Sequence, residues 1–436
     1  MLRKTLLMKR GAVLALLVIG VLLGAVWAQT ETVLYSFCEQ KNCTDGAEPV
    51  AGIVFDQKGN LYGTTRTGGA YQYCSDVGFG CGVVFKLTRA GKYTLLHTFC
   101  EQGGNCTDGA NPYAASVLDP EGNLYGTTEY GGVHGQGVVF KLTPEGQYAV
   151  LHSFCARNNC TDGYDPSAGL ALDQKGNLYG TTAYGGAHGG GVVFKLTSDG
   201  KYTVLHSFCQ QGYPCTDGTG PRGGLVLDQD GNLYGTTLLG GGFIGYCSDV
   251  GYGCGVVFKL TPKGNATALY SFCAQSNCTD GASPYAGLVL DQTGNLYGTT
   301  TYGGANCSPG YGCGVVFKLA PKGKETVLYN FCAQTGCPDG SNPSLGRLVF
   351  DPKGNLYGTT VDGGTPSCNY FSGCGVVFKF APKGKETVLY SFCPQWPSCT
   401  DGDDPLTGLV FDQKGNLYGT TLGGGHGGGV VFKLTP

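Results

Sequence analysis

The chain has 436 residues, including 78 Gly and 22 Cys, and only 14% of its residues are charged, with a formal net charge of −3. So many glycines exclude a mainly helical protein, because each glycine inside a helix costs roughly 1 kcal/mol relative to alanine. Disorder and collagen are also excluded, because 41% of the residues are hydrophobic and glycine does not recur at every third position. A turn-rich, all-β protein is therefore expected.

Residues 1–28 are predicted to be a secretory signal peptide. Four basic residues precede an apolar run from Ala12 to Val26, and the small residue Ala28 precedes the expected cleavage point. An uncleaved membrane anchor is the alternative, although the run is shorter than the ~20 residues of a spanning helix. Cleavage would leave 24 of the 28 basic residues against 31 acidic ones, a formal charge of −7. This argues against nucleic acid or stable membrane insertion, and predicts a secreted, extracellular or periplasmic protein.

Seven internal repeats follow. The string GNLYGTT begins at residues 59, 122, 176, 231, 294, 354 and 415, so the period is 54 to 63 residues. Each period carries four short apolar runs, which in the second unit are residues 116–119, 123–128, 137–143 and 149–154. Four strands per repeat are typical of a β-propeller blade. Tight DPEGN-like and TPEGQ-like turns join strands one to two and three to four, so the longer loops all share the opposite face.

The two ends of the chain predict how the ring closes. Residues 32–37 read as an orphan fourth strand, and residues 429–434 read as a third strand without a fourth. We expect these two segments to pair, because pairing removes the open edge of an incomplete blade. Residues 29–436 are therefore predicted to form one domain, a seven-bladed propeller with four antiparallel strands per blade, and to be a monomer.

All 22 cysteines fall into local pairs, which predicts disulfides rather than zinc sites in a secreted chain. Seven pairs follow the outer strand: Cys38/Cys43, Cys100/Cys106, Cys155/Cys160, Cys209/Cys215, Cys273/Cys278, Cys332/Cys337 and Cys393/Cys399. Four more lie in the longer loops between strands two and three: Cys74/Cys81, Cys247/Cys254, Cys307/Cys313 and Cys368/Cys374. Repeats without the second pair have shorter loops, so insertion and disulfide occur together.

Residues shared by all repeats are interpreted as structural. The Asp of the C-[TP]-D-G motif, such as Asp45, is expected to accept backbone hydrogen bonds in a turn, with the next glycine at positive φ. A sevenfold calcium ring is the alternative, although one carboxylate per loop is too few for calcium. The glycine of LYGTT is expected where neighbouring sheets approach closely. The lysine of VVFKL, such as Lys86, is expected to extend along the blade edge.

A binding site needs positions on the long-loop face at which one repeat differs from the others. Just after GTT, and just before the innermost strand, nine such residues are candidate ligand contacts: Arg66, Tyr113, Glu129, Tyr130, Tyr184, Arg222, Tyr285, Tyr302 and Asp362. Tyrosine faces, arginine forks and carboxylates at a channel mouth suit a polar ligand, particularly a sugar. An ordinary hydrated surface is the alternative.

The histidines give weaker signals. His97, His152 and His206 replace tyrosine in outer strands and are interpreted as packing substitutions. His134 and His188 occupy equivalent loop positions in adjacent repeats and could share a metal, although propeller geometry disfavours a complete site. No motif for a catalytic triad, zinc protease or nucleotide fold occurs, and no metal or cofactor is expected.

The pattern GNLYGTTxxGG…GVVFKLTPxGKxTVLYSF resembles that of the Gloeo/Verruco (GloVer) tandem-repeat proteins, and its blade core is similar to NHL-type and two-component-regulator propellers. The resemblance implies a secreted bacterial propeller and supplies no catalytic residue. We interpret the chain as an extracellular binding module for glycans or envelope proteins. The alternatives are a lyase or hydrolase, for which Arg66, Glu129, Arg222 and Asp362 would be the candidates, and a scaffold without a small ligand.

Overall fold

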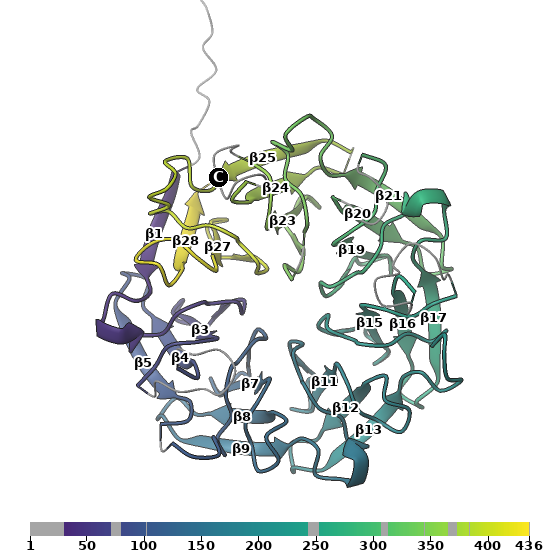
Figure 1. The fold of residues 1–436 in the computed structure, drawn as a ribbon, viewed down its shortest axis with the longest axis horizontal. Coiled ribbons are helices and arrows are strands. Elements are labelled where there is room, and N and C mark those ends of the chain that lie inside the picture. Colours follow the sequence, from purple (N-terminus) through teal and green to yellow (C-terminus); the bar gives the residue numbers. More distant parts are fainter. Residues whose placement is uncertain are drawn as a thin grey trace, which may run out of the picture.

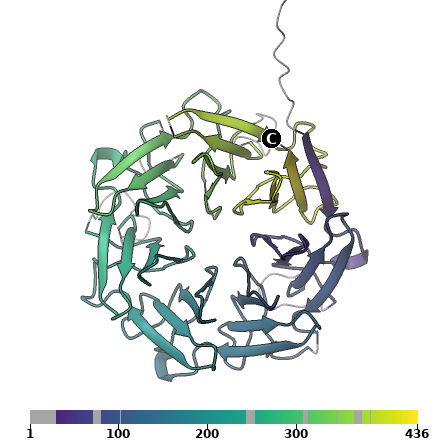
Figure 2. The ribbon, with the colours of Figure 1, turned by 180° about the vertical axis from the view of Figure 1, so that it is seen from behind.

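Seven four-stranded antiparallel sheets surround a central opening that is visible from both sides of the disc (Figures 1 and 2). The computed structural model describes residues 30–70, 80–101, 103–242, 253–306, 313–343, 345–364, 373–382 and 384–435. The predicted all-β, seven-bladed propeller is confirmed. The predicted signal peptide lies outside the described residues.

In blades 1 to 6 the strands run outward from the channel in chain order. Blades 1 to 3 consist of β2 (Val54–Phe55), β3 (Leu61–Thr65), β4 (Val83–Leu87) and β5 (Tyr93–Thr98); β6 (Val117–Leu118), β7 (Leu124–Thr128), β8 (Val138–Leu142) and β9 (Tyr148–Ser153); and β10 (Ala171–Leu172), β11 (Leu178–Thr182), β12 (Val192–Leu196) and β13 (Tyr202–Ser207).

Blades 4 to 6 repeat the same arrangement. They consist of β14 (Val226–Leu227), β15 (Leu233–Thr237), β16 (Val256–Leu260) and β17 (Ala266–Ser271); β18 (Val289–Leu290), β19 (Leu296–Thr300), β20 (Val315–Leu319) and β21 (Glu325–Asn330); and β22 (Val349–Phe350), β23 (Leu356–Thr360), β24 (Val376–Phe380) and β25 (Glu386–Ser391). Three short 3-10 turns follow outer strands: η1 (Lys41–Cys43), η2 (Asn158–Cys160) and η3 (Ser276–Cys278).

Blade 7 is built from both ends of the chain. Its strands β26 (Val410–Phe411), β27 (Leu417–Thr420) and β28 (Val430–Thr435) are completed by the N-terminal β1 (Thr30–Ser36). β1 pairs antiparallel with β28, and the two strands lie side by side as purple and yellow arrows in Figure 1. The predicted ring closure is confirmed, and β1 begins two residues earlier than the sequence suggested. The closure leaves blade 7 with the same four strands as the other blades.

The core lies between neighbouring blades. One cluster, for example, joins Phe37 and Val431 of blade 7 to Ile53 and Phe85 of blade 1. The glycine of LYGTT serves this packing in a way that the sequence analysis misassigned. Gly63 pairs with Phe85 on the adjacent strand of the same blade, and a Cβ on Gly63 would lie 2.7 Å from Cζ of Phe85. The glycine therefore makes room for an aromatic ring on its own sheet rather than for a neighbouring sheet.

The lysine of VVFKL lies over the tyrosine of LYGTT on the paired strand. In blade 1, Nζ of Lys86 is 5.1 Å from the ring centroid of Tyr62, and the same contact recurs in blades 2 to 6. The ammonium group thus contacts the face of an aromatic ring on the same blade. The lysine lies on the third strand of the blade, which is paired on both sides, and its contact with the tyrosine was not predicted from the sequence.

The turn aspartate ties each blade to the next. Asp45 accepts hydrogen bonds from the backbone N–H groups of Glu39 and Gln40, at 3.1 and 3.3 Å, and from the Tyr35 hydroxyl at 2.8 Å. The following Gly46 has φ +100°. The predicted backbone hydrogen bonds to the aspartate and the positive φ of the next glycine are confirmed. The turn is not of the Asx type, because the donating amides lie five and six residues before the aspartate. The carboxylate that the calcium alternative would use accepts hydrogen bonds from the protein.

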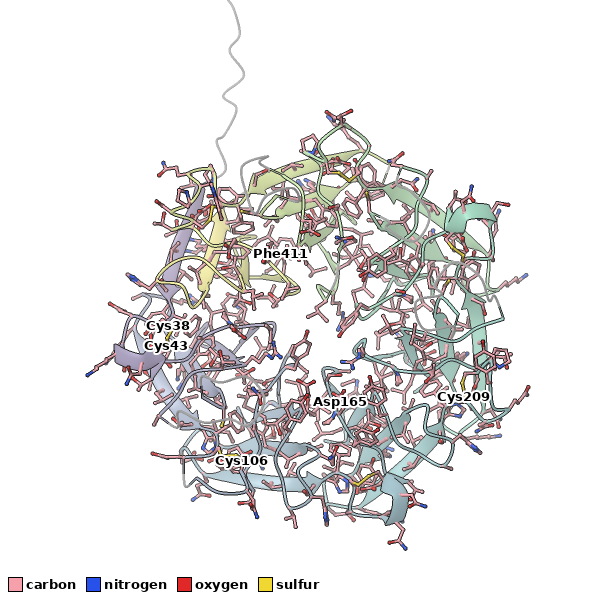
Figure 3. All side chains as sticks on the ribbon, viewed as in Figure 1. Cys38, Cys43, Cys106, Asp165, Cys209 and Phe411 are labelled. Atoms are coloured by element: carbon pink, nitrogen blue, oxygen red, sulfur yellow. A yellow bond between two sulfur atoms is a disulfide. The ribbon has the colours of Figure 1, made fainter. Side chains whose placement is uncertain are left out.

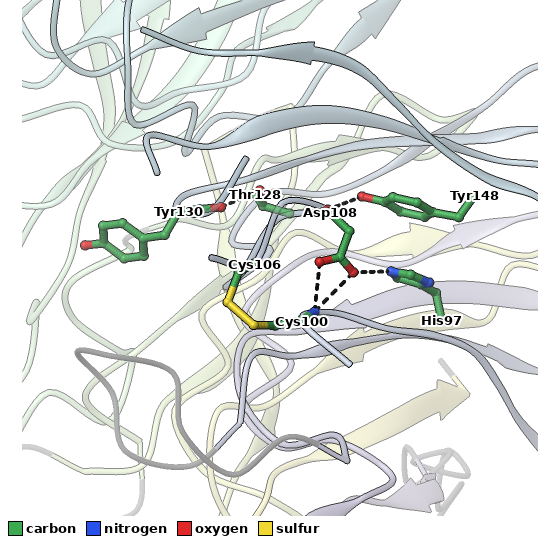
Figure 4. Close-up of polar contacts among 7 residues, drawn as sticks. All are labelled: His97, Cys100, Cys106, Asp108, Thr128, Tyr130 and Tyr148. Carbon is green, nitrogen blue, oxygen red and sulfur yellow. Dashed lines mark hydrogen bonds and ion pairs between the residues drawn. A yellow bond between two sulfur atoms is a disulfide. The ribbon is translucent and has the colours of Figure 1, made fainter. Parts of the chain in front are cut away.

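In blades 1 to 3 a histidine takes the place of the tyrosine that contacts this aspartate. Nε2 of His97 lies 3.1 Å from Oδ2 of Asp108, and the ring stacks on Tyr148 of the next blade at 3.9 Å (Figure 4). The Tyr148 hydroxyl donates to the backbone carbonyl of Asp108. These histidines are therefore part of the blade junction, as packing substitutions for tyrosine.

The seven outer-strand disulfides pair as predicted: Cys38–Cys43, Cys100–Cys106, Cys155–Cys160, Cys209–Cys215, Cys273–Cys278, Cys332–Cys337 and Cys393–Cys399. Cys81, Cys254, Cys313 and Cys374 are also disulfide-bonded; their predicted partners lie outside the described residues. So many disulfides indicate an oxidising extracellular or periplasmic environment. Among the described residues, no helix has the length and hydropathy needed to cross a membrane.

Candidate functional site

A cavity of about 720 Å³ occupies the centre of the ring. Its wall consists of the innermost strands and the segments that lead into them, so all seven blades contribute to it. Most of the lining is aliphatic or glycine, and the polar exceptions include Arg222, Tyr113 and Tyr285. A volume of this size, with few polar groups on an apolar wall, is typical of small-molecule sites.

Seven residues with a left-handed backbone conformation, one from each repeat, position the loops at one end of this cavity. In every repeat the turn reads D-G-x-X-P, and the residue X before the proline has φ between +53° and +65°. Its amide donates to a carbonyl of the preceding blade, and its carbonyl accepts from the residue just after GTT. The seven X residues are Glu48, Asn111, Asp165, Gly220, Ser283, Asn342 and Asp404. Because the backbone bonds are the same in each blade, the X side chains vary freely.

Arg222 is the centre of a polar cluster at the channel mouth. Its guanidinium donates to Oδ2 of Asp165 at 3.2 Å and to Oγ of Ser167 at 3.3 Å. It also lies 3.4 Å from the hydroxyls of Tyr184 and Tyr285 and faces both rings, at 5.7 and 5.9 Å from their centroids. Arg222 belongs to blade 4, while its partners come from blades 3 and 5. Figure 3 places Asp165 nearer the central opening than the labelled disulfides.

Four more candidates continue the cluster toward blades 1 and 2. Tyr113 interacts with Tyr285 through its hydroxyl, and the Arg66 guanidinium lies 5.7 Å from the centroid of the Tyr113 ring. Glu129 lies among Arg66, Arg222 and Asp165, and hydrogen bonds with Tyr130. Two arginines, several tyrosines and two carboxylates therefore form one connected network across five blades.

The charges in this network are unevenly compensated. Burial raises the pKa of the Glu129 carboxyl, and Asp165 raises it further, while Arg66 and Arg222 lower it. Burial also raises the pKa of Asp165 against the opposing effect of Arg222. For Arg222, burial alone would lower the pKa, but Tyr285 and Asp165 hold it above its usual value. The guanidinium is therefore permanently charged, while Oε2 of Glu129 and Oδ1 of Asp165 are buried without a hydrogen-bond partner.

A second, acidic group lies on blades 6 and 7. Burial raises the pKa of Asp404 to about 7, and the charges of Asp403 and Asp362 add to this shift. The Asn342 side chain donates to Asp362. Asp362 was one of the sequence candidates, whereas Asp403 and Asp404 were not recognised. A carboxyl that titrates near neutrality is suited to proton transfer.

The structure thus brings seven of the nine predicted candidates into one network: Arg66, Tyr113, Glu129, Tyr130, Tyr184, Arg222 and Tyr285. Asp362 belongs to the acidic group instead. Tyr302 pairs through its backbone with Ala282, its side chain contacts neither group among the described residues, and 44% of its surface is exposed. His134 and His188 are exposed, and no metal-binding cluster in the described part of the chain contains either of them.

The sequence matches the Gloeobacter/Verrucomicrobia repeat over residues 23–246 and 239–436. The chain belongs to the Gloeobacter/Verrucomicrobia repeat family. This membership agrees with the resemblance found in the repeat pattern, and the family description names no activity. No curated protein is detectably similar to this member of the family.

Several solved structures are similar to this Gloeobacter/Verrucomicrobia repeat protein in fold. A gluconolactonase from Xanthomonas campestris is 17% identical and aligns over 72% of this chain and 82% of its own, with a TM-score of 0.37. A putative 6-phosphogluconolactonase from Bacteroides uniformis is 17% identical over 83% and 89% of the two chains, with a TM-score of 0.48. A luciferin-regenerating enzyme is 15% identical over 74% and 90%, with a TM-score of 0.40. Such similarity carries no information about activity.

Proposed function

We propose that this Gloeobacter/Verrucomicrobia repeat protein is an extracellular or periplasmic binding module that holds a polar ligand, most simply a glycan, at the loop-side mouth of its central channel. The observation that carries the proposal is the Arg222 network. Arg222 gathers Asp165, Ser167, Tyr184 and Tyr285 from neighbouring blades beside the 720 Å³ cavity. No such network is needed to hold a blade together, because other blades fold with Ser, Val or Leu at the position of Arg222.

The aromatic groups of the network support a saccharide ligand. Tyr184 is 44% exposed, and its ring stacks on Tyr164 at 5.4 Å. A second ring behind the first fixes the plane of the exposed tyrosine, which gives a flat platform of low conformational entropy. Sugar rings bind such platforms with their C–H faces, while arginine and carboxylate groups hydrogen bond with their hydroxyls. The rigid propeller supplies the loops with a fixed spacing.

The acidic group favours one other candidate function, a hydrolase or lyase. Asp404, with a pKa of about 7, lies near Asp403 and Asp362, and could act as a general acid or base on a substrate held at the same face. In that case Asp404→Asn would abolish turnover of the bound glycan while leaving its affinity within about twofold. If the glycan is bound but never altered, the binding function alone stands.

A glycan array tests the proposal on the purified chain 29–436, oxidised, with and without calcium. Tyr184→Ala and Tyr302→Ala form a matched pair, because the two tyrosines occupy equivalent positions after GTT and are both 44% exposed, but only Tyr184 contacts Arg222. We expect Tyr184→Ala to weaken binding by about tenfold and Tyr302→Ala to change it by less than about twofold. Equal losses would place the ligand outside the Arg222 network. A silent array would instead favour an envelope protein as the partner, tested by pull-down from envelope extract.

A further inference from the structure

Arg347 interrupts a ring of small residues in the wall of the central cavity. Counted back four positions from the aspartate that ends each innermost segment, the other six blades hold Gly52, Ala115, Gly169, Gly224, Gly287 and Gly408. These residues approach one another closely from blade to blade: a Cβ on Gly408 would lie 3.0 Å from the carbonyl oxygen of Arg347, and one on Gly287 would lie 2.9 Å from that of Gly224. Blade 6 alone places a long cationic side chain in this ring.

Among the residues that the structure describes, the guanidinium of Arg347 has no counter-charge. Its side chain lines the cavity and is exposed to the solvent inside it. The surrounding protein still lowers the pKa of Arg347 by desolvation, and no described carboxylate opposes this effect. No described residue forms an ion pair or hydrogen bond with it. The nearest comparison is Arg222, which is also in the cavity wall but is paired with Asp165 at 3.2 Å. Two acidic residues, Asp228 and Asp291, also line the cavity. Each carboxylate already accepts hydrogen bonds from an asparagine side chain and a tyrosine hydroxyl.

We propose that Arg347 is a binding site for the carboxylate of a ligand that occupies the central channel. An arginine fork matches the two oxygens of a carboxylate, and such a bond is stronger in an enclosed, partly desolvated cavity than in water. Beside Arg347 the wall is aliphatic or glycine, and the other charged side chains of the lining, Arg222, Asp228 and Asp291, already have protein partners. The ligand therefore carries its negative charge at one end and an uncharged body behind it. The identity of this body rests on the proposed glycan function. With that function, the ligand is an acidic sugar residue such as a uronate.

Two variants separate the charge of Arg347 from its bulk. Arg347→Ala installs the residue that blade 2 has at this position, Ala115, and Arg347→Lys keeps the charge without the fork. We expect Arg347→Ala to fold normally, with an unchanged or slightly raised Tm, because it removes an unpaired charge. Thermal unfolding checks this point before any binding is measured.

Isothermal titration with three probes then tests the site: a galacturonate trisaccharide, the corresponding neutral galactose trisaccharide, and hexanoate as an acid without a sugar. We expect the galacturonate to lose roughly 10- to 100-fold in affinity with Arg347→Ala, less with Arg347→Lys, and the neutral sugar to be unaffected. The affinity for each acidic probe, galacturonate or hexanoate, should also fall as the salt concentration is raised.

The outcomes distinguish this inference from the proposed function. Galacturonate binding that survives Arg347→Ala but is lost in Tyr184→Ala would overturn the inference and keep the glycan function. Hexanoate binding that depends on Arg347, with no binding of either sugar, would support the carboxylate site and contradict the glycan function. If neither acid binds at low salt, the inference is wrong.

Discussion

Three outer strands carry a glutamate near their start where three others begin with a tyrosine, and this difference predicts how stability depends on pH. In blades 1 to 3 the tyrosine hydroxyl donates to the backbone carbonyl of the turn aspartate of the preceding blade, as from Tyr93 to Asp45 at 2.7 Å and from Tyr202 to Asp162 at 2.5 Å. Blades 5, 6 and 7 instead have Glu325, Glu386 and Glu31 at this place. A carboxyl can replace the tyrosine as a donor only when it is protonated.

The environment of these three carboxyls favours protonation. Burial raises the pKa of Glu31, Glu325 and Glu386 to about 7 in each case, and the turn aspartates Asp401, Asp280 and Asp339, respectively, add to the shift. In each glutamate Oε1 is buried without a hydrogen-bond partner. Because the folded state binds these protons more tightly than the unfolded state, their contribution to stability is complete below the ordinary glutamate pKa of 4.5. It is lost as the pH rises through about 7.

The size of this loss follows from the shift. One pKa unit corresponds to about 1.4 kcal/mol, so a shift from 4.5 to about 7 would give roughly 3 kcal/mol for a fully enclosed group. The three carboxyls keep partial contact with solvent, which screens them, so we halve the figure to about 1.5 kcal/mol each and about 4.5 kcal/mol together. The triple variant Glu31→Tyr, Glu325→Tyr, Glu386→Tyr should lack this loss, because tyrosine donates at every pH in the range.

Urea unfolding of the oxidised protein, followed by circular dichroism from about pH 4.5 to 8, measures the effect. The free-energy difference between the triple variant and the wild type should grow by about 4.5 kcal/mol across this range. Other groups that titrate there, such as His152, whose pKa burial lowers, cancel in the difference. The converse variant Tyr202→Glu should introduce the same pH dependence into blade 3. A difference that stays constant with pH would refute the reasoning.

Three further predictions concern the blade junctions and the site. Asp280→Ala should cost about 3 kcal/mol in urea unfolding, because it leaves Tyr270, Ala274 and Gln275 without their acceptor. Replacing Cys273 and Cys278 by serine should cost about 2 kcal/mol and leave the fold intact by circular dichroism, since the bridge closes only a short loop. Arg222→Ala should lower stability by about 2 to 3 kcal/mol because Asp165 is left unpaired, and a second change, Asp165→Ser, should restore most of it in a double-mutant cycle.

The blade architecture could be predicted because its determinants are local and occur seven times. The four strands, the pairing of β1 with β28 and the seven short disulfides all follow from residues close in sequence or from one unpaired strand at each end. The function of the LYGTT glycine was misassigned for a physical reason. A glycine in a strand signals a close approach, but the sequence does not say whether a neighbouring sheet or the ring of Phe85 fills the space.

The site was predicted only in part, because its contacts join different repeats. Tyr113, Arg222 and Tyr285 were identified as departures from the repeat, but their partner Asp165 was not, since the residue before the proline differs widely among the copies. The signal that could have found it is the shared D-G-x-X-P spacing, in which X is forced into the same backbone conformation seven times. Arg347 was missed because blade 6 has one extra residue after its proline, which hides the alignment with the ring of small residues.

The repeats separate residues that hold the ring together from residues that are free to differ between blades. Turn aspartates, strand glycines and aromatic rings satisfy one another within a blade or with its neighbour, so each is needed in every copy. The X residue contributes only its backbone to this scaffold, and the residue just after the proline, as at Arg222, varies equally from blade to blade. Charged side chains can therefore accumulate at these positions without weakening the ring. Arg222 accordingly lies among groups from three blades, whereas the turn aspartates and strand glycines are the same in every copy.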